Sequence, residues 1–469
     1  MATALRKPIV LVGYMGAGKS TIAAEVAARL GAVRVDSDET IEEDMSGGLS
    51  ISQIFEERGE EAFRTLERDL IVSLLSKGDP NLVIALGGGA VTIPEVRSAL
   101  RSHAFTVWLD ADLETCWSRA EGSGRPLAGD EASFRALYAQ REPLYREVAD
   151  AVAGDADDVV LAAAGIDVGL GALERLGELV PGEGPVALVA DSHVAGIHGA
   201  DAQLALGGRV TSTHEVAGKT SADLEALWRS LRLDRGGTIV ALGGGTTTDL
   251  AGFAAATYMR GVDWVAVPTS LVGQVDAAIG GKTAIDLPEA KNLVGSFHWP
   301  TGTVIDPALL ATLPEEERQN GLAEVVKTGL LAGEPLWEVP EPELVRRCAA
   351  YKAALCLRDP DDRGPRHALN LGHTFAHALE AASAYKLSHG RAVALGLLAA
   401  LRLSGRETSP VEDALAPEPV RVDRQRAWEA LLRDKKGRLR IVLLGDDGAH
   451  EEELPEADVR AALDALIAE

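Results

Sequence analysis

Hydrophobic and polar positions alternate in a regular pattern along the first third of the chain. Short apolar runs of strand length, at residues 8–13, 81–86 and 105–109, are separated by segments whose apolar residues recur at helical spacing. Strands that alternate with amphipathic helices are typical of βαβ units and of a parallel sheet covered by helices. We therefore predict an α/β domain with a parallel sheet over residues 1–158.

The same alternation restarts after about residue 158. Apolar runs at residues 185–190, 238–243 and 263–268 predict further buried strands. From residue 306 onward the apolar spacing is helical, and one lone strand is predicted at residues 439–445, after the turn DKKGR. We therefore predict a Rossmann-like α/β domain over residues 159–305 and a mainly helical domain over residues 306–469.

Composition limits the partners of this chain. Its 46 Lys and Arg residues face 71 Asp and Glu residues, and the net charge of −25 disfavours adhesion to nucleic acid or anionic membranes. No apolar run approaches the roughly 20 residues of a membrane-spanning helix. The three cysteines form no C-x-x-C pair, which fits a reducing compartment. We expect a cytoplasmic protein, with no nucleic-acid or membrane partner, that binds phosphates in local basic pockets.

The run GYMGAGKST follows a predicted strand and opens a predicted helix. In this context the pattern G-x-x-x-x-G-K-[ST] predicts a nucleoside triphosphate site. Backbone N–H groups of such a loop wrap phosphate oxygens, the lysine reaches the β- and γ-phosphates, and the hydroxyl ligates Mg²⁺. The residues expected to bind ATP and Mg²⁺ are Gly13, Gly16, Gly18, Lys19, Ser20 and Thr21.

Further polar residues are candidates for recognising the group that accepts the phosphate. The segment VDSD ends the second predicted strand and places Asp36 and Asp38 beside the loop. One carboxylate could then order the ligand shell of the Mg²⁺ ion while the other accepts a hydrogen bond from a polyol substrate. A helix N-cap would account for the same sequence without any ligand. An arginine can bind a substrate carboxylate through two parallel hydrogen bonds. Taken singly, each arginine is also compatible with an ordinary surface salt bridge. The remaining candidates are Arg64, Arg125, Arg141 and the backbone of Gly87, Gly88 and Gly89.

These motifs, in this order, resemble the shikimate kinase family over residues 1–157. The resemblance implies ATP-dependent phosphorylation of shikimate in a P-loop kinase domain. It implies that Asp36 orders the Mg²⁺ shell, that Arg119 lies near the adenine, and that Arg125 neutralises the transferring phosphoryl group. Lys19, Asp38 and Arg125 are then catalytic. Shikimate is expected to contact Asp38, Arg64, Gly87, Gly88, Gly89 and Arg141.

The second half carries three residues that suit a metal. Glu324, His373 and His389 come from separate segments, and one carboxylate with two imidazoles leaves a Zn²⁺ ion open to substrate oxygens. His377 lies one helical turn after His373, so both face the same side. Two such histidines alone more often belong to a helix surface or a core. The many cations nearby favour instead a site for an anionic ligand.

This half resembles the 3-dehydroquinate synthase family from about residue 160 to the C-terminus, in the motifs LGGGTTTDLAGF, VPTSLVGQVDAAIGGKT, KNLVGSF, GLAEVVK, LNLGHTFAHALE and HGRAV. The resemblance implies conversion of 3-deoxy-arabino-heptulosonate 7-phosphate to 3-dehydroquinate and phosphate. It implies NAD⁺ in the α/β domain, Zn²⁺ or Co²⁺ on Glu324, His373 and His389 in the helical domain, and a homodimer formed through this half.

Individual residues follow from the same resemblance. The NAD⁺ contacts that it implies are Gly243, Gly244, Gly245, Asp249, Thr269 and Ser270, with Asp191 and Lys219 at the adenosine end. Substrate contacts are expected at Arg260, Asp276, Lys291, Asn292 and Asn370, and at Lys435 or Lys436. The residues expected to act in catalysis are Lys282, Lys327, Lys352, Arg366 and His377.

The sequence also departs from this family. Thr246, Thr247 and Thr248 stand where the family usually has two small apolar residues and a glycine, Arg391 replaces a usual Glu, and Asp362 replaces a longer acid. Two helical connections, at residues 327–352 and 405–435, are shorter than usual. Two alternatives therefore stay open for this half, a related sugar-phosphate cyclase and a degenerate NAD-binding scaffold. Retention of the substrate-facing residues favours the synthase.

Overall fold

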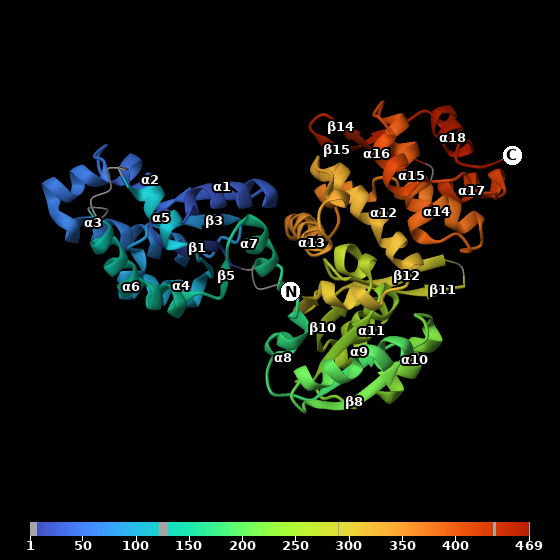
Figure 1. Cartoon of the computed structure of the whole chain (residues 1–469), viewed down its shortest axis with the longest axis horizontal. Helices are drawn as coiled ribbons and strands as arrows, with labels where there is room; N and C mark the ends of the chain where they lie inside the picture. The colour runs from blue at the N-terminus through green and yellow to red at the C-terminus, as the bar shows by residue number, and fades with distance from the viewer. Residues whose placement is uncertain (1–6, 122–129, 289, 435–437, 469) are drawn as a thin grey trace. The chain divides into compact units, whose positions relative to one another are not determined.

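The computed structural model describes residues 7–121, 130–288, 290–434 and 438–468. The chain forms two compact units that divide between Gly165 and Ile166 (Figure 1). Helix α7 (Ala156–Ala163) crosses the boundary predicted after residue 158, and it contacts strand β5 (Ala151–Ala153) and helix α1 (Lys19–Leu30) of the first unit. The three-domain division at residues 158 and 305 stays a prediction.

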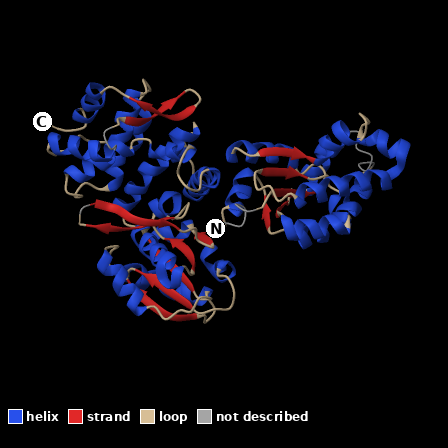
Figure 2. Ribbon diagram, turned by 180° about the vertical axis from the view of Figure 1, so that it is seen from behind, coloured by secondary structure: helices blue, strands red, loops and turns tan. Residues whose placement is uncertain are grey.

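The first unit contains a five-stranded parallel sheet in the order β2-β3-β1-β4-β5. All five residues of the central strand β1 (Ile9–Gly13) are buried, as fits an apolar strand in a sheet covered on both faces. β3 (Leu82–Ala85) and β4 (Phe105–Leu109) flank β1, and the edge strands are β2 (Val33–Asp36) and β5. Besides α1 and α7, helices α2 (Ser37–Thr40), α3 (Ile51–Ser76), α4 (Pro94–His103), α5 (Leu113–Ala120) and α6 (Glu131–Val148) surround the sheet (Figure 2).

The second unit begins with a six-stranded parallel sheet in the order β6-β13-β10-β9-β7-β8. Its strands are β6 (Ile166–Val168), β7 (Val186–Ala190), β8 (Val210–Glu215), β9 (Thr238–Gly243), β10 (Asp263–Pro268) and β13 (Gly302–Ile305). The accompanying helices are α8 (Leu176–Leu179), α9 (Ser192–Ala205), α10 (Ser221–Ser230) and α11 (Gly245–Thr257). An antiparallel hairpin, β11 (Lys282–Leu287) with β12 (Ala290–Phe297), projects from this part.

The rest of the second unit is helical. Helices α14 (His373–Ala382) and α15 (His389–Leu403) pack against each other, and α15 also contacts α12 (Glu315–Ala332). Fully buried Phe375 and nearly buried Leu398 and Trp428 belong to their common apolar core. The other helices are α13 (Glu341–Arg358), α16 (Ser409–Leu415), α17 (Arg424–Asp434) and α18 (Glu456–Asp464). The predicted fold class, two parallel α/β sheets followed by a helical region, is confirmed.

The prediction that the late strand stands alone is wrong. The late strand β14 (Arg440–Gly445) is not alone, because it pairs antiparallel with β15 (Gly448–Glu453). The sequence of β15, GAHEEE, is rich in residues that are depleted in strands and has no apolar alternation, so its pattern did not indicate a strand. Within the described ranges, none of the helices has the length and apolar character needed to span a lipid bilayer.

Candidate functional sites

The loop from β1 to α1 depends on glycine. Gly16 and Gly18 have φ of +85° and +90°, in the left-handed region that other residues rarely adopt. A Cβ atom at Gly16 would in addition lie 2.3 Å from the carbonyl oxygen of Cys116. Any side chain at Gly16 would therefore strain the backbone and collide with α5.

Two cationic side chains donate hydrogen bonds to the backbone of this loop, Lys19 from the start of α1 and Arg119 from α5. Lys19 Nζ donates hydrogen bonds to the carbonyl oxygens of Gly13 and Tyr14, both at 2.9 Å. Arg119 Nη1 donates to the carbonyl oxygen of Gly16 at 3.2 Å. An ammonium and a guanidinium beside a glycine loop at a helix N-terminus suit a polyphosphate.

Asp36 joins the loop to the end of β2. Ser20 Oγ donates to Asp36 Oδ2 at 2.6 Å, and Arg34 Nη2 lies 3.3 Å from the same oxygen. The other oxygen, Oδ1, accepts from the backbone N–H groups of Asp38 and Glu39, so Asp36 also caps α2. The two interpretations of the VDSD segment are thus compatible, because one oxygen caps the helix while the other meets Ser20.

The glycines after β3 lie against charged side chains. A Cβ at Gly87 would be 2.6 Å from Asp38 Oδ1 and 2.7 Å from Glu67 Oε1, and a Cβ at Gly89 would be 2.4 Å from Arg64 Nη1. Only glycine therefore lets these three side chains approach the backbone. The structure brings together four of the predicted acceptor-site positions here, Asp38, Arg64, Gly87 and Gly89.

Glu67 belongs to this pocket although the sequence analysis did not single it out. Its side chain is fully buried and its Oε2 lies 2.7 Å from Arg64 Nη1. Burial raises the pKa of Glu67 to about 7, and the nearby Arg64 guanidinium only partly opposes this shift. The spacing of Arg64 and Glu67, three residues apart on helix α3, is a signal that could have indicated the pair.

Helix α6 closes the same pocket. The buried Arg141 Nη1 donates to the carbonyl oxygen of Gly88 at 3.2 Å, and Tyr145 donates its hydroxyl to the same oxygen at 2.6 Å. Arg141 is therefore fixed on the backbone turn that carries the glycines. Arg125, the predicted lid residue, lies outside the described residues.

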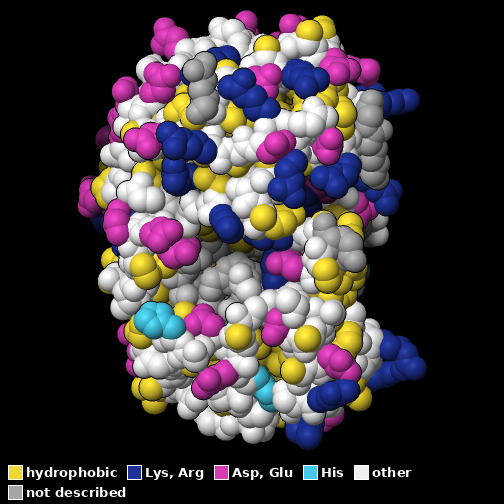
Figure 3. Space-filling model, turned by 90° about the vertical axis from the view of Figure 1, so that its right-hand side faces the viewer, with side chains coloured by type: hydrophobic (Ala, Val, Ile, Leu, Met, Phe, Trp, Pro, Cys, Tyr) yellow, Lys and Arg dark blue, Asp and Glu magenta, His cyan; other side chains and the backbone are white. Residues whose placement is uncertain are grey.

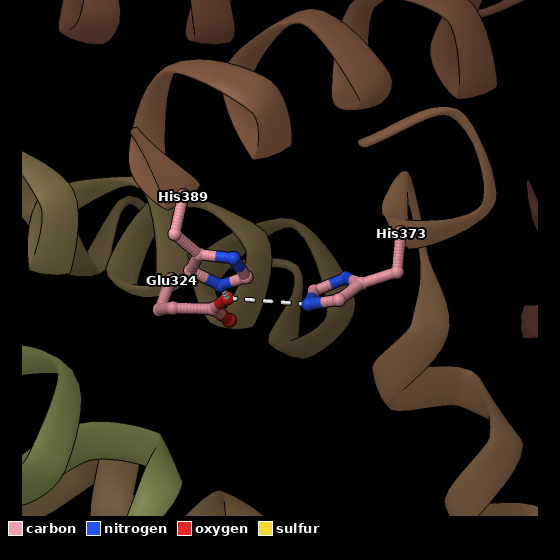
Figure 4. A group of neighbouring side chains, drawn as sticks. All are labelled: Glu324, His373 and His389. Atoms are coloured by element: carbon pink, nitrogen blue, oxygen red, sulfur yellow. Dashed lines mark hydrogen bonds and ion pairs between the residues drawn. The ribbon is translucent and has the colours of Figure 1, made fainter. Parts of the chain in front are cut away.

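Three side chains converge in the helical part of the second unit. One ligand atom from each of Glu324 on α12, His373 at the start of α14 and His389 at the start of α15 lies within 4.8 Å of the others. Glu324 Oε1 is 3.3 Å from His373 Nε2 and 3.0 Å from His389 Nε2 (Figure 4). Both imidazoles thus turn the same ring nitrogen toward the carboxylate.

The chemistry of these donors fits a divalent metal. One carboxylate and two imidazoles leave a position open on a four-coordinate Zn²⁺ ion, and Co²⁺ accepts the same donors. Burial raises the pKa of Glu324, but Lys327 and the two histidines outweigh burial and hold it well below its usual value. Burial lowers the pKa of His389, and its bonds to Glu324 and Glu380 reverse this and raise it to about 10.

Two buried lysines share one aspartate beside this cluster. Lys352 Nζ lies 2.8 Å from Asp276 Oδ1 and donates to its carbonyl oxygen at 2.7 Å. Lys327 Nζ lies 3.5 Å from the same Asp276 oxygen and pairs with Glu324. The lysines hold the pKa of Asp276 below its usual value despite its burial. Two ammonium groups, each paired with a carboxylate, therefore lie next to the candidate metal centre.

The other residues predicted to act in catalysis come from separate parts of the second unit, and each is placed by its contacts. Arg366 is buried, and its Nη2 donates to the carbonyl oxygen of Gly280 at 3.0 Å. Lys282 on β11 pairs with Asp362 at 2.5 Å. The His377 ring centroid is 5.6 Å from that of His373. Figure 3 shows Lys and Arg side chains gathered on a face of the second unit, above a hollow.

The glycine turn after β9 resolves one departure noted in the sequence. Gly244 caps α11, and Thr246, Thr247 and Thr248 lie inside the first turns of that helix. None of the three threonines has a positive φ. β-branched residues are tolerated in a right-handed helix. The backbone therefore does not need glycine at these positions.

Lys219 connects the helix α11 with the β11–β12 hairpin. Its Nζ lies 2.7 Å from Asp249 Oδ2 on α11 and 2.5 Å from Asn292 Oδ1 on β12. Burial raises the pKa of Asp249, with Lys219 partly opposing the shift. Asp191 lies elsewhere, where its Oδ1 caps α9 through the N–H of Val194 at 3.0 Å.

The other predicted contacts are more dispersed. Thr269 and Ser270 follow β10, and Thr269 donates its N–H to the carbonyl oxygen of Gly243 at 3.0 Å. Lys291 Nζ lies 4.6 Å from the ring centroid of Tyr385. Arg260 is exposed, and its side chain makes no hydrogen bond or ion pair with a described residue; Asn370 ends a short 3₁₀ helix. Lys435 and Lys436 lie outside the described residues.

Three family models match the chain. The shikimate kinase model matches residues 15–164, the 3-dehydroquinate synthase N-terminal model residues 210–320, and the 3-dehydroquinate synthase C-terminal model residues 321–436. Together they follow the two compact units of the structure.

Similar proteins are known over nearly the full length. A bifunctional shikimate kinase/3-dehydroquinate synthase from Thermotoga maritima is 33% identical and covers 91% of this chain and 93% of the relative. A 3-dehydroquinate synthase from Bordetella pertussis is 38% identical, covering 64% of this chain and 95% of the relative.

Solved structures resemble the second unit. A 2-deoxy-scyllo-inosose synthase with carbaglucose-6-phosphate, NAD⁺ and Co²⁺ has a TM-score of 0.58 at 22% identity. A 2-epi-5-epi-valiolone synthase from Streptomyces hygroscopicus subsp. jinggangensis 5008, with NAD⁺ and Zn²⁺, has a TM-score of 0.56 at 24% identity. Each covers 64% of this chain and 96% of its own. At these identities the likeness shows the fold alone.

Proposed function

We infer that each half of this chain works at the site described above, on the premise that the chain belongs to the family of bifunctional shikimate kinase/3-dehydroquinate synthases. The chain is an enzyme with both activities of the shikimate pathway. The observation that carries this conclusion is the similarity to one bifunctional relative over 91% of the chain.

The first half transfers a phosphoryl group from ATP to shikimate. Lys19 contacts the β- and γ-phosphates, while Ser20 and Asp36, whose oxygens are 2.6 Å apart, hold the Mg²⁺ shell. Asp38 accepts the proton of the reacting hydroxyl. Arg119 lies near the adenine and Arg125 neutralises the transferring group. Shikimate is held by Arg64, Arg141 and the Gly87, Gly88 and Gly89 backbone.

The second half converts 3-deoxy-arabino-heptulosonate 7-phosphate to 3-dehydroquinate and phosphate. Glu324, His373 and His389 hold Zn²⁺ or Co²⁺. A metal held there would polarise the hydroxyl that is oxidised, and bound NAD⁺ would supply the hydride acceptor. The chain's own residues bind and orient the anionic substrate and move its protons: Arg260, Asp276, Lys282, Lys291, Asn292, Lys327, Lys352, Arg366, Asn370, His377 and Lys435 or Lys436.

The glycine turn after β9 would hold NAD⁺. A helix N-terminus with glycine before it suits a pyrophosphate, as in other dinucleotide sites. We assign its contacts to Gly243, Gly244, Gly245, Asp249, Thr269 and Ser270, with Asp191 and Lys219 at the adenosine end. We further propose that the enzyme is cytoplasmic and forms a homodimer through the synthase half.

The experiment is to supply each substrate to the purified full-length chain. With heptulosonate phosphate, NAD⁺ and Zn²⁺ we expect 3-dehydroquinate and inorganic phosphate in equal amounts. With shikimate and Mg²⁺-ATP we expect shikimate 3-phosphate. A different carbocycle would favour a related sugar-phosphate cyclase, and failure to bind NAD⁺ or zinc would favour a degenerate scaffold.

A further inference from the structure

His389 lies between two carboxylates. Its Nε2 is 3.0 Å from Glu324 Oε1, and its Nδ1 is 3.5 Å from Glu380 Oε1. Glu380 lies on α14, seven residues after His373, and only 6% of it is exposed. Its side chain therefore stands behind His389, on the side of the ring away from the candidate metal position.

His389 pairs with Glu380, and the charges of His377 and Lys291 also act on this carboxylate. Burying a carboxylate without a compensating partner is costly, so this position needs the contact. The backbone of Glu380 is also fixed, because its carbonyl oxygen accepts from Tyr385 N at 2.7 Å and from Ser383 Oγ at 2.8 Å. The backbone that carries this carboxylate is thus fixed near the end of α14.

We propose that Glu380 is a positioning residue for the metal centre. By accepting the Nδ1–H of His389, it selects the tautomer whose Nε2 lone pair is free to bind metal, and it fixes the plane of the ring. This inference rests on the metal site of the proposed function. It adds a residue that touches no metal, substrate or cofactor.

The other histidine shows how the two ligands differ. His373 Nδ1 lies 3.2 Å from the carbonyl oxygen of Leu371, so a backbone group orients that ring. A side-chain substitution leaves the backbone carbonyl beside His373 in place, whereas a substitution at Glu380 removes the carboxylate beside His389. Substitution of Glu380 should therefore loosen one ligand and leave the other oriented.

The test measures zinc affinity in the full-length chain. Parent, Glu380→Gln and Glu380→Ala proteins are stripped of metal and titrated with Zn²⁺ against a chromophoric chelator. Loss of such an outer partner weakens metal binding by about 10- to 100-fold, which we expect for Glu380→Ala. Glu380→Gln keeps an oxygen that accepts the hydrogen bond, so we expect a smaller loss. The matched control is Glu412→Gln, an exposed glutamate on α16 that should bind zinc like the parent.

The visible absorption spectrum of bound Co²⁺ supplies a readout that loss of stability does not imitate. We expect its bands to shift in Glu380→Ala, because the His389 ring is no longer fixed. The thermal unfolding transition of the second unit, compared with that of the parent in the same samples, reports that this unit is folded.

The outcomes separate the inference from its premise. A parent protein that binds no zinc would contradict the proposed metal site. A parent that binds zinc, with Glu380→Gln and Glu380→Ala within threefold of it and with unchanged Co²⁺ spectra, would overturn the role of Glu380. If Glu380→Ala does not fold, Glu380→Met, which keeps the side-chain length and removes the acceptor, takes its place, and parent-like zinc affinity with an unchanged Co²⁺ spectrum in that variant overturns the role of Glu380.

Discussion

Arg64 and Glu67 form an ion pair, 2.7 Å between Nη1 and Oε2, inside the pocket that also contains Asp38 and the glycine turn after β3. The carboxylate of Glu67 is fully buried, whereas Arg64 stays partly accessible. A substrate carboxylate that binds Arg64 therefore meets a guanidinium that already has a buried partner.

Glu67 should make the stability of the first unit depend on pH. Burial raises its pKa to about 7 in the folded protein, above its usual 4.5, so the folded state holds this proton more tightly than the unfolded chain. The stabilisation is complete below about pH 4.5 and is lost as pH rises through 7. We expect up to about 3 kcal/mol of loss between pH 4.5 and 8.

The measurement is calorimetry of parent and Glu67→Gln proteins at pH 5 and pH 8, following the unfolding of the first unit, identified by its stabilisation with ATP. The variant should lose less stability over this range, since the amide does not titrate. An equal pH dependence in both proteins would show that Glu67 has an ordinary pKa. Glu61→Gln, an exposed residue of the same helix, is the control.

Lys19→Ala should separate the two activities. Removing the ammonium from the phosphate-binding loop should lower shikimate phosphorylation at least about 100-fold, while formation of 3-dehydroquinate stays near the parent rate. Both rates are measured on the same preparation, with Lys77→Ala, at the exposed end of α3, as the control. Loss of both activities in a folded protein would argue against independent sites.

Chelation followed by dialysis should have a lasting effect on the synthase activity alone. A strong chelator followed by dialysis should remove synthase activity, which Zn²⁺ or Co²⁺ restores, whereas kinase activity should return with Mg²⁺ alone. His373→Ala should lower bound zinc and synthase turnover together. Metal analysis and both assays decide this, and a His373→Ala protein with full zinc content would exclude His373 as a ligand.

The sequence predicted much of this architecture because central strands such as β1 and β7 are apolar throughout and its phosphate loop has a strict spacing. It did not predict β15, whose GAHEEE sequence lacks a strand pattern. It indicated the residues that carry family motifs, such as Glu324 and His389, but not Glu67 or Glu380. The spacing of Glu67 from Arg64 offered a signal for their pairing, but the burial of both carboxylates depends on tertiary packing.

Asp249 offers a prediction that distinguishes NAD⁺ binding from metal binding. It lies on the helix after the glycine turn, and Lys219 ties it to Asn292 on the hairpin. Asp249→Ala removes an acceptor and leaves the Lys219 ammonium without that partner.

We expect NAD⁺ affinity to fall about 10- to 100-fold, which corresponds to about 1.4 to 2.7 kcal/mol. Zinc content should not change, because Asp249 is not among the three candidate ligands. Equilibrium dialysis of NAD⁺ and metal analysis on the same samples test both statements, with Asp263→Asn, an exposed residue at the start of β10, as the control. Loss of zinc together with NAD⁺ would mean that the α11 helix supports the metal centre too, while parent-like NAD⁺ affinity would remove Asp249 from the dinucleotide site.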